Sequence, residues 1–175
     1  VPQPTPVPAG NARPMPDVSI LVVSYNTREL TLACLGSIYD HTSKARFEII
    51  VVDNASNDNS ADEIARSFPR VRLFRQEKNT GFALANNFAA QHATGRYLLL
   101  LNPDTVVLNG AIDRLVAFAD AHPEAALFGG RTIFPHGGLN PTSCWREPSL
   151  QGLAFRAFGL DNALKNSPRF NRDSY

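Results

Sequence analysis

The sequence predicts an α/β protein with a mostly parallel sheet flanked by helices. Short β-branched or leucine-rich runs alternate with segments of helical spacing, which is typical of right-handed strand–helix–strand crossovers. Two of these runs, 49–52 and 98–101, stop at Asp53 and at Asn102-Pro103-Asp104. Because ligands bind at the carboxyl ends of strands in an open parallel sheet, these polar residues indicate a binding site there.

The elements are expected in alternating order along the chain. Val18 begins a β-branched run, so the first strand is expected at 18–24, and helices are expected wherever apolar residues recur three and four positions apart. Ser60 and Glu63 have the spacing of a capping box that begins the second helix. The predicted strands are 18–24, 48–52, 71–75, 97–101, 126–128 and 131–134, and the predicted helices are 27–39, 60–68, 83–93, 112–121 and 150–160. The run 98–101 is apolar throughout, so we expect it to be buried on both faces of the sheet.

Composition and charge describe an ordinary globular chain. The 175 residues are 43% hydrophobic and 19% charged with a formal net charge of +1, so no nucleic-acid partner is expected. Residues 1–16 hold six prolines and are expected to be a disordered leader. The folded domain is expected at 17–134, followed by a partly irregular region at 135–175. The two cysteines, Cys34 and Cys144, show no metal-ligand spacing and favour a reducing, cytoplasmic environment.

Four polar clusters follow the four predicted strands, at 24–27, 53–56, 79–82 and 102–104. Helix capping remains an equal alternative for Asn26, Thr27 and Ser60, since these residue types are favoured caps. Capping is a weaker account of Asp53 and Asp104, because several residues separate each of them from the next helix. No glycine-rich phosphate loop is present, so a divalent metal, Mn²⁺ or Mg²⁺, is expected to bind the phosphates through Asp104 with Asn102 in support.

The segments 18–26, 51–60, 79–87 and 98–104 together resemble the family 2 glycosyltransferases, which have the GT-A fold. The resemblance covers 17–134 and continues more weakly to residue 146. Within the family, Asn79-Thr80-Gly81-Phe82-Ala83 and Leu101-Asn102-Pro103-Asp104 are most similar to bacterial rhamnosyltransferase-like enzymes of cell-surface polysaccharide synthesis. The resemblance implies transfer of a sugar, here rhamnose, from a UDP- or dTDP-linked donor to a saccharide or lipid-linked acceptor with inversion.

The resemblance also implies individual roles. Asp53 would accept the imide N–H of uracil or thymine, and Tyr25 and Asn26 would line the base pocket. Asn102 and Asp104 would stand for the D-x-D motif of the family, with Asp104 on the metal. The nucleotide-binding residues implied are Ser24, Tyr25, Asn26, Asp53, Asn54, Asn79, Gly81, Asn102 and Asp104.

The chain departs from the family pattern at two points. Asn102 replaces the first acid of D-x-D, which should weaken metal affinity, and no match to the catalytic-base motif occurs before Tyr175. The catalytic base is therefore unknown, and the chain is expected to be a GT-A domain truncated on its C-terminal side, with residues 135–175 beginning the acceptor side. Uncovered apolar surface there would favour self-association or a partner chain, and the enzyme would be cytoplasmic or peripheral to the inner face of the membrane. An inactive nucleotide-binding module and a nucleotidyltransferase remain as alternatives.

Overall fold

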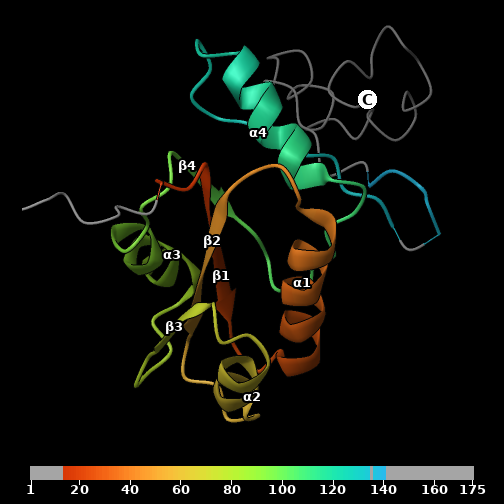
Figure 1. Cartoon of the computed structure of the whole chain (residues 1–175). Coiled ribbons are helices and arrows are strands. Elements are labelled where there is room, and N and C mark those ends of the chain that lie inside the picture. Colours follow the sequence, from red (N-terminus) through yellow and green to blue (C-terminus); the bar gives the residue numbers. More distant parts are fainter. Residues whose placement is uncertain (1–13, 135, 141–175) are drawn as a thin grey trace, which may run out of the picture. The chain divides into compact units, whose positions relative to one another are not determined.

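The computed structural model describes residues 14–134 and 136–140. The chain separates into two compact units, Val1–Pro123 and Glu124–Tyr175. All helices and strands of the described residues lie in the first unit, as Figure 1 shows. They are β1 (Val18–Ser24), α1 (Arg28–His41), β2 (Phe47–Asp53), α2 (Ser60–Ser67), β3 (Arg72–Arg75), α3 (Phe82–Gln91), β4 (Tyr97–Leu100) and α4 (Ala111–Ala121).

The four strands form one parallel sheet in the order β3-β2-β1-β4. The register pairs Val18 with both Phe47 and Tyr97, so β1 lies between β2 and β4. The chain moves from β1 outward to β3 on one side and then returns to place β4 on the other side of β1. This change of direction makes the space between β1 and β4 a topological switch point, where open α/β sheets form their ligand crevice.

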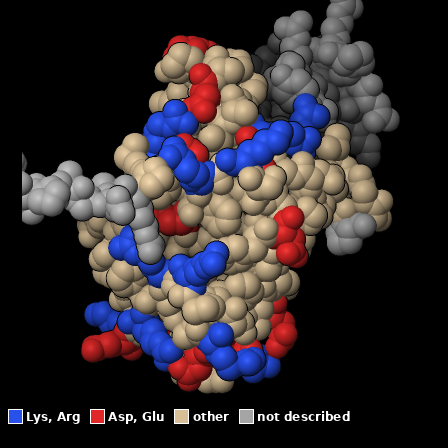
Figure 2. All heavy atoms as spheres, in the orientation of Figure 1, with Lys and Arg blue, Asp and Glu red and all other residues tan. Residues whose placement is uncertain are grey.

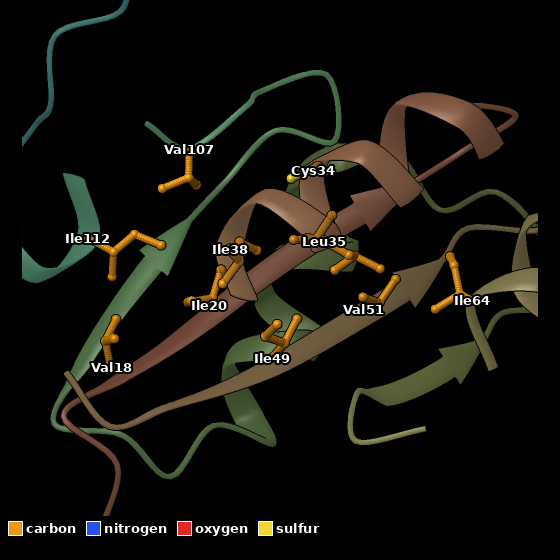
Figure 3. Close-up of a cluster of buried hydrophobic side chains, with 11 residues drawn as sticks. Val18, Ile20, Cys34, Leu35, Ile38, Ile49, Val51, Ile64, Val107 and Ile112 are labelled. Atoms are coloured by element: carbon orange, nitrogen blue, oxygen red, sulfur yellow. The ribbon is translucent and has the colours of Figure 1, made fainter. Parts of the chain in front are cut away.

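Two layers of helices cover the sheet. On one face, β1 and β2 pack against α1 through a cluster that includes Ile20, Leu35 and Val51, all of them fully buried (Figure 3). On the other face, Leu21 and other sheet residues pack against α3, which presents the small residues Ala85 and Ala89. Fully burying a side chain such as Leu or Ile contributes about 1.5–3 kcal/mol, so these two clusters stabilise the central strands most strongly.

The expectation that both faces of the fourth strand are buried is wrong for the described residues. Leu98 is 49% exposed and Leu100 is 55% exposed, whereas Leu99 is partly buried against the α1 side. The reason is that α3 contacts β1 and β2, while β4 lies at the edge of the described sheet.

The prediction that Ser60 and Glu63 form a capping box is also wrong. Asn59, with φ of 66°, is the N-cap of α2, and Ser60 is its first helical residue. The Glu63 carboxylate is paired instead with Arg66. The Asp58 carboxylate accepts the Ser60 N–H at 3.0 Å, so the capping acceptor lies two residues earlier than predicted.

The described residues of the second unit have less regular structure than the sequence suggested. Residues 126–128 form no strand, and Leu127 is 92% exposed, so it has no sheet to pack against within the described chain. The strand expected at 131–134 is limited to a single antiparallel bridge between Ile133 and Leu139. The helix expected at 150–160 and Cys144 lie outside the described residues. No helix within 14–134 and 136–140 has the length and apolarity needed to span a membrane.

Candidate functional site

The carboxyl ends of β1, β2 and β4 meet at one rim of the sheet. Ser24 and Asp53 are partners in the parallel ladder, and Leu101 continues the pairing beyond β4 by donating its N–H to the carbonyl of Leu21 at 2.9 Å. Asn102 follows immediately. β2 and β4 lie two interstrand spacings, roughly 10 Å, apart across the sheet, and Leu100 at the end of β4 is level with Ile50, three residues before Asp53. The four polar clusters predicted to share an edge of the sheet do so.

Asp53 has an unusual environment at this rim. It ends β2 and is only 4% exposed. Its Oδ2 accepts the N–H of Ser56 at 3.1 Å, but its Oδ1 is buried without a hydrogen-bond partner among the described residues. Ala55 makes this turn possible by adopting a left-handed φ of 66°. A buried carboxylate oxygen without a donor is costly, so Oδ1 is suited to accept a hydrogen bond from a ligand.

Asn54 fixes the loop that precedes α3. Its side chain is 2% exposed; Nδ2 donates to Asn79 Oδ1 at 2.9 Å, and Oδ1 accepts the Thr80 N–H at 3.0 Å. Two weaker contacts, to the Thr80 hydroxyl and the Gly81 carbonyl, use its remaining capacity. The buried Asn54 side chain therefore fixes residues 79–81 at the rim. Asn79 is exposed and keeps its Nδ2 donors, so it remains a candidate for ligand contact.

Gly81 requires a backbone conformation that only glycine tolerates well. Its φ of 83° and ψ of 165° lie in a region essentially restricted to glycine. Its N–H donates to Asn79 Oδ1 at 2.8 Å, and a Cβ added at Gly81 would meet no atom within 4 Å. Gly81 thus sets the path of the exposed loop rather than making room for a neighbouring atom.

Ser24 lies inside the rim rather than on it. Its side chain has no exposed area, and its hydroxyl lies 3.2 Å from the Thr27 hydroxyl and 3.0 Å from that of Thr31. Thr27 and Thr31 are 3.1 Å apart, so the three hydroxyls form a closed triangle in which each can donate once and accept once. Tyr25, the next residue, is 46% exposed and lies at the surface of the rim.

Asn26 joins the loop after β1 to the loop after β2. Its N–H donates to the Ser56 hydroxyl at 3.0 Å, and its Oδ1 accepts the N–H of Asn57 at 2.8 Å. Asn26 has a positive φ of 53°, which asparagine tolerates better than most residues. It makes no side-chain cap to α1, and neither does Thr27, although Thr27 is the N-cap residue.

Asn102 and Asp104 are both exposed in the turn after β4. The carbonyl of Asn102 accepts the Thr105 N–H at 3.1 Å, which closes the turn around Pro103. Burial, together with the nearby Asp104 charge, raises the pKa of Cys34 to about 12, so this thiol stays protonated beside the turn.

The donor atoms of this turn fit one kind of metal site. No group of three or more His, Cys, Asp or Glu side chains suited to a metal occurs within 14–134 and 136–140. A single exposed carboxylate does not make a protein-only site. It does fit a Mg²⁺ or Mn²⁺ ion whose other ligands are phosphate oxygens and water.

Sequence reasoning missed Asp58. Its carboxylate accepts the N–H of Arg28 at 2.9 Å as well as that of Ser60, and so contacts the first residue of two helices. The available signal was an aspartate, a residue type favoured for helix capping, two residues before a predicted helix. A hollow of about 430 Å³ lies beside Asp58 and Arg28, but the Asp58 oxygens and the Arg28 side chain are already engaged, so we assign it no ligand.

The fold and the rim define an α/β protein of the Rossmann-like type, which binds its ligand where the carboxyl ends of parallel strands meet at a switch point. Comparison with known proteins identifies the family within this class. The sequence model of glycosyl transferase family 2 matches residues 19–171, and the chain belongs to this family.

Curated and solved relatives are consistent with that membership. TuaG of Bacillus subtilis, named for teichuronic acid biosynthesis, is 28% identical over 155 residues, covering 87% of this chain and 58% of TuaG. The chain thus spans little more than half the length of that relative.

Two solved structures share the fold. S. aureus TarS 1–349 in complex with UDP-GlcNAc has a TM-score of 0.55 at 25% identity, covering 61% of this chain and 32% of TarS. The mannosyltransferase PcManGT of Pyrobaculum calidifontis, in complex with GDP-Man and Mn²⁺, has a TM-score of 0.55 at 27% identity, covering 61% of this chain and 33% of PcManGT. The predicted α/β fold of the GT-A type is therefore confirmed.

Proposed function

We propose that this chain binds a nucleoside-diphosphate sugar at the rim and forms the donor-binding part of a glycosyltransferase of cell-surface polysaccharide synthesis. One observation carries the proposal most directly, namely the buried Oδ1 of Asp53, which has no hydrogen-bond partner among the described residues. The exposed Tyr25 follows Ser24, which is the ladder partner of Asp53. Family membership supports it, and so do the nucleotide sugars named for TarS and PcManGT. The acceptor is proposed to be a saccharide or a lipid-linked saccharide.

The chemistry of Asp53 favours certain bases. A carboxylate oxygen only accepts hydrogen bonds, so it suits a base that presents a ring N–H. Uracil and thymine present such a group, whereas cytosine and adenine present a lone pair at the corresponding edge. Guanine also carries a ring N–H but is larger than uracil and thymine. We propose that the space beside Tyr25 and Asn26 is too small for guanine and accepts the pyrimidines. We propose UDP or dTDP as the nucleotide, with Asn79 and Gly81 close to it.

The diphosphate is proposed to lie toward β4, where Asp104 would hold a divalent cation and Asn102 would contact a metal-bound water or the ribose. Bound there, Mn²⁺ or Mg²⁺ would neutralise the charge of the departing diphosphate. Asp104 would position the cation and Pro103 would hold the turn. We further propose that transfer inverts the anomeric carbon, that the donor sugar is rhamnose, and that the base acting on the acceptor hydroxyl is not among the described residues.

Calorimetry with UDP, dTDP, GDP and CDP tests the base-binding assignment. The variant Asp53→Ala should lose a hydrogen bond to a charged group, worth about 1.5–3 kcal/mol, which corresponds to an affinity loss of about ten- to a hundredfold. Asp62→Ala is a matched control, because it removes an exposed carboxylate of α2 that pairs with Arg75. Unchanged UDP and dTDP affinity in Asp53→Ala would refute the assignment.

Nucleotide binding without sugar transfer is the alternative function of the same rim. The two are separated by product formation from a labelled nucleotide sugar and a saccharide acceptor. A panel of UDP- and dTDP-linked sugars in the same assay tests the rhamnose proposal, and the anomeric configuration of the product tests inversion.

A further inference from the structure

The Asp58 carboxylate lies between the N-termini of α1 and α2. Its Oδ2 accepts the N–H of Arg28, the first residue of α1, at 2.9 Å, and its Oδ1 accepts the N–H of Ser60, the first residue of α2, at 3.0 Å. The Ser60 hydroxyl donates to the same Oδ1. The first N–H groups of a helix lack intrahelical acceptors and carry partial positive charge, so one carboxylate stabilises both ends.

Both oxygens of Asp58 and its charge are needed for this bridge. Partial burial opposes ionisation, but hydrogen bonds from the Ser60 hydroxyl and from the N–H groups of Arg28 and Ser60 lower the pKa of Asp58 below its ordinary value. The group is therefore a carboxylate at neutral pH. An amide at this position offers a single acceptor oxygen, and its NH₂ group would face one of the two helix N-termini.

A second set of hydrogen bonds joins the same two loops and reaches Asp53, and the loop backbones at 26–28 and 56–58 connect it to the Asp58 bridge. The loop between β1 and α1 is joined to the loop between β2 and α2 by Asn26, through Ser56 Oγ at 3.0 Å and the Asn57 N–H at 2.8 Å. Ser56 also donates its N–H to Asp53 Oδ2 at 3.1 Å. The same residue thus contacts the neighbouring loop with its hydroxyl and the Asp53 carboxylate with its backbone.

The two loops contain backbone conformations that need such support. Asn26, Ala55 and Asn59 have φ values of 53°, 66° and 66°. Non-glycine residues keep a left-handed conformation only where surrounding contacts fix it, and such residues cluster at functional sites. Asp58 supplies contacts where both loops enter their helices.

We propose that Asp58 is a positioning residue that ties the N-termini of α1 and α2 together, fixes the Ser56 N–H on Asp53 Oδ2, and so leaves Asp53 Oδ1 free and oriented toward the nucleotide base. The inference rests on the proposed binding of a nucleotide by Asp53. Asp58 itself acts through the two loops and makes no contact with the base.

The test uses Asp58→Asn with Asp113→Asn as a matched control. Asp113 of α4 also uses its carboxylate to accept backbone N–H groups, those of Ser43, Lys44 and Ala45 at 3.0, 3.2 and 2.9 Å. That loop precedes β2 and lies at the opposite end of the strand from Asp53. Both variants lose a charged acceptor of backbone N–H groups, but only Asp58→Asn is expected to affect the rim. Asp58→Ser, which can cap α2 alone, replaces Asp58→Asn if that variant does not fold.

Two measurements distinguish positioning from general stability. The Ser56 amide should exchange its hydrogen faster in Asp58→Asn than in Asp113→Asn when both are compared at equal global stability. In a double-mutant cycle, Asp58→Asn should lower UDP affinity about tenfold in the parent chain and have little effect in Asp53→Ala, since its effect is proposed to pass through Asp53 and coupled residues are not additive.

The outcomes separate the two proposals. Equal Ser56 exchange in the two variants overturns the inference, whatever the nucleotide does. The inference is also overturned if Asp58→Asn lowers UDP affinity in Asp53→Ala by the same tenfold as in the parent chain. The effect of Asp58 would then not pass through Asp53. If Asp53→Ala itself binds UDP as tightly as the parent, the proposed function fails, and the Ser56 amide still decides whether Asp58 fixes the Asp53 carboxylate.

Discussion

At the scale of single residues, the rim divides into side chains that contact each other and side chains that remain available. Asn54 uses every donor and acceptor of its amide within the protein, and Ser24 has no exposed surface. Asp53 Oδ1 lacks a partner among the described residues, while Tyr25 and Asp104 are exposed. We therefore propose ligand contact for the second group, and the first group gives the rim its shape.

Asp104 provides the test at this scale. Asp104→Asn should remove the metal dependence of nucleotide binding, because it replaces the one carboxylate of the turn by a neutral amide. The expected loss of Mn²⁺ affinity is at least the roughly 10–100-fold that changes around a metal site commonly produce. Mn²⁺ binding followed by electron paramagnetic resonance, with UDP titrations before and after EDTA, measures it.

Asn102→Asp is the complementary variant. Restoring the first acid of the family motif should tighten Mn²⁺ binding, since hard divalent cations favour carboxylate oxygens. A parent chain whose UDP affinity is unaffected by EDTA would contradict the metal role of this turn.

At the scale of elements, Glu48 connects four parts of the fold at the end of the sheet opposite the rim. Its Oε1 accepts hydrogen bonds from Ser19 of β1 at 2.6 Å and from the Thr94 N–H at 2.6 Å, and Arg72 of β3 pairs with its Oε2 at 2.9 Å. Burial opposes the charge of Glu48, but these hydrogen bonds lower its pKa from 4.5 to about 2. The carboxylate therefore stabilises the folded chain.

This lowered pKa predicts acid sensitivity. The unfolded chain binds a proton at Glu48 near its ordinary pKa of 4.5, whereas the folded chain resists protonation until about pH 2. The stabilisation is complete above about pH 4.5 and is lost progressively as the pH falls to about 2. Urea unfolding of the parent and Glu48→Gln between these pH values measures it, with the variant expected to lose less stability on acidification. Parallel pH profiles would contradict the assignment.

The elements also show what sequence patterns can and cannot predict. The bounds of β1 were predicted without error, because they depend on the β-branched residues of the segment itself and not on distant contacts. The exposure of Leu98 and Leu100 was not, since it depends on where α3 packs rather than on the strand itself. The pairing of Asn54 with Asn79 and of Asp58 with Arg28 joins residues 25 and 30 positions apart, so no local pattern reveals it. Asp53 could be selected from the sequence as a candidate site residue because a carboxylate directly follows an apolar run.

At the scale of the whole chain, charge gives little protection against association. The formal net charge is +1, and in Figure 2 acidic and basic side chains lie near one another on the face in view. Several form surface ion pairs, such as Arg46 with Asp17 and Arg96 with Asp120, which contribute little stability individually. A chain with so small a net charge has weak electrostatic repulsion between copies.

We predict self-association through the edge of β4, which has no strand partner on its outer side among the described residues. Leu98 and Leu100 are about half exposed at the edge of the described sheet, and an edge strand offers backbone hydrogen-bonding groups to another chain. We expect the 175-residue chain to sediment as concentration-dependent oligomers, and Leu98→Thr with Leu100→Thr to shift it toward monomer. Leu127→Thr, at a highly exposed leucine of the second unit, is the control. Sedimentation velocity that does not distinguish the three proteins would contradict this.

The position of β1 between β2 and β4 has a consequence for how the chain folds. Val18 pairs with Phe47, 29 residues away, and with Tyr97, 79 residues away. By the logarithmic dependence of loop-closure entropy, the second pairing costs about 1 kcal/mol more than the first when each forms from an open chain. Pairing of β1 with β2, which brings Ser24 beside Asp53, is therefore the less costly first step. Docking of β4, which carries Asp104 to the same rim, gains from the sheet already formed.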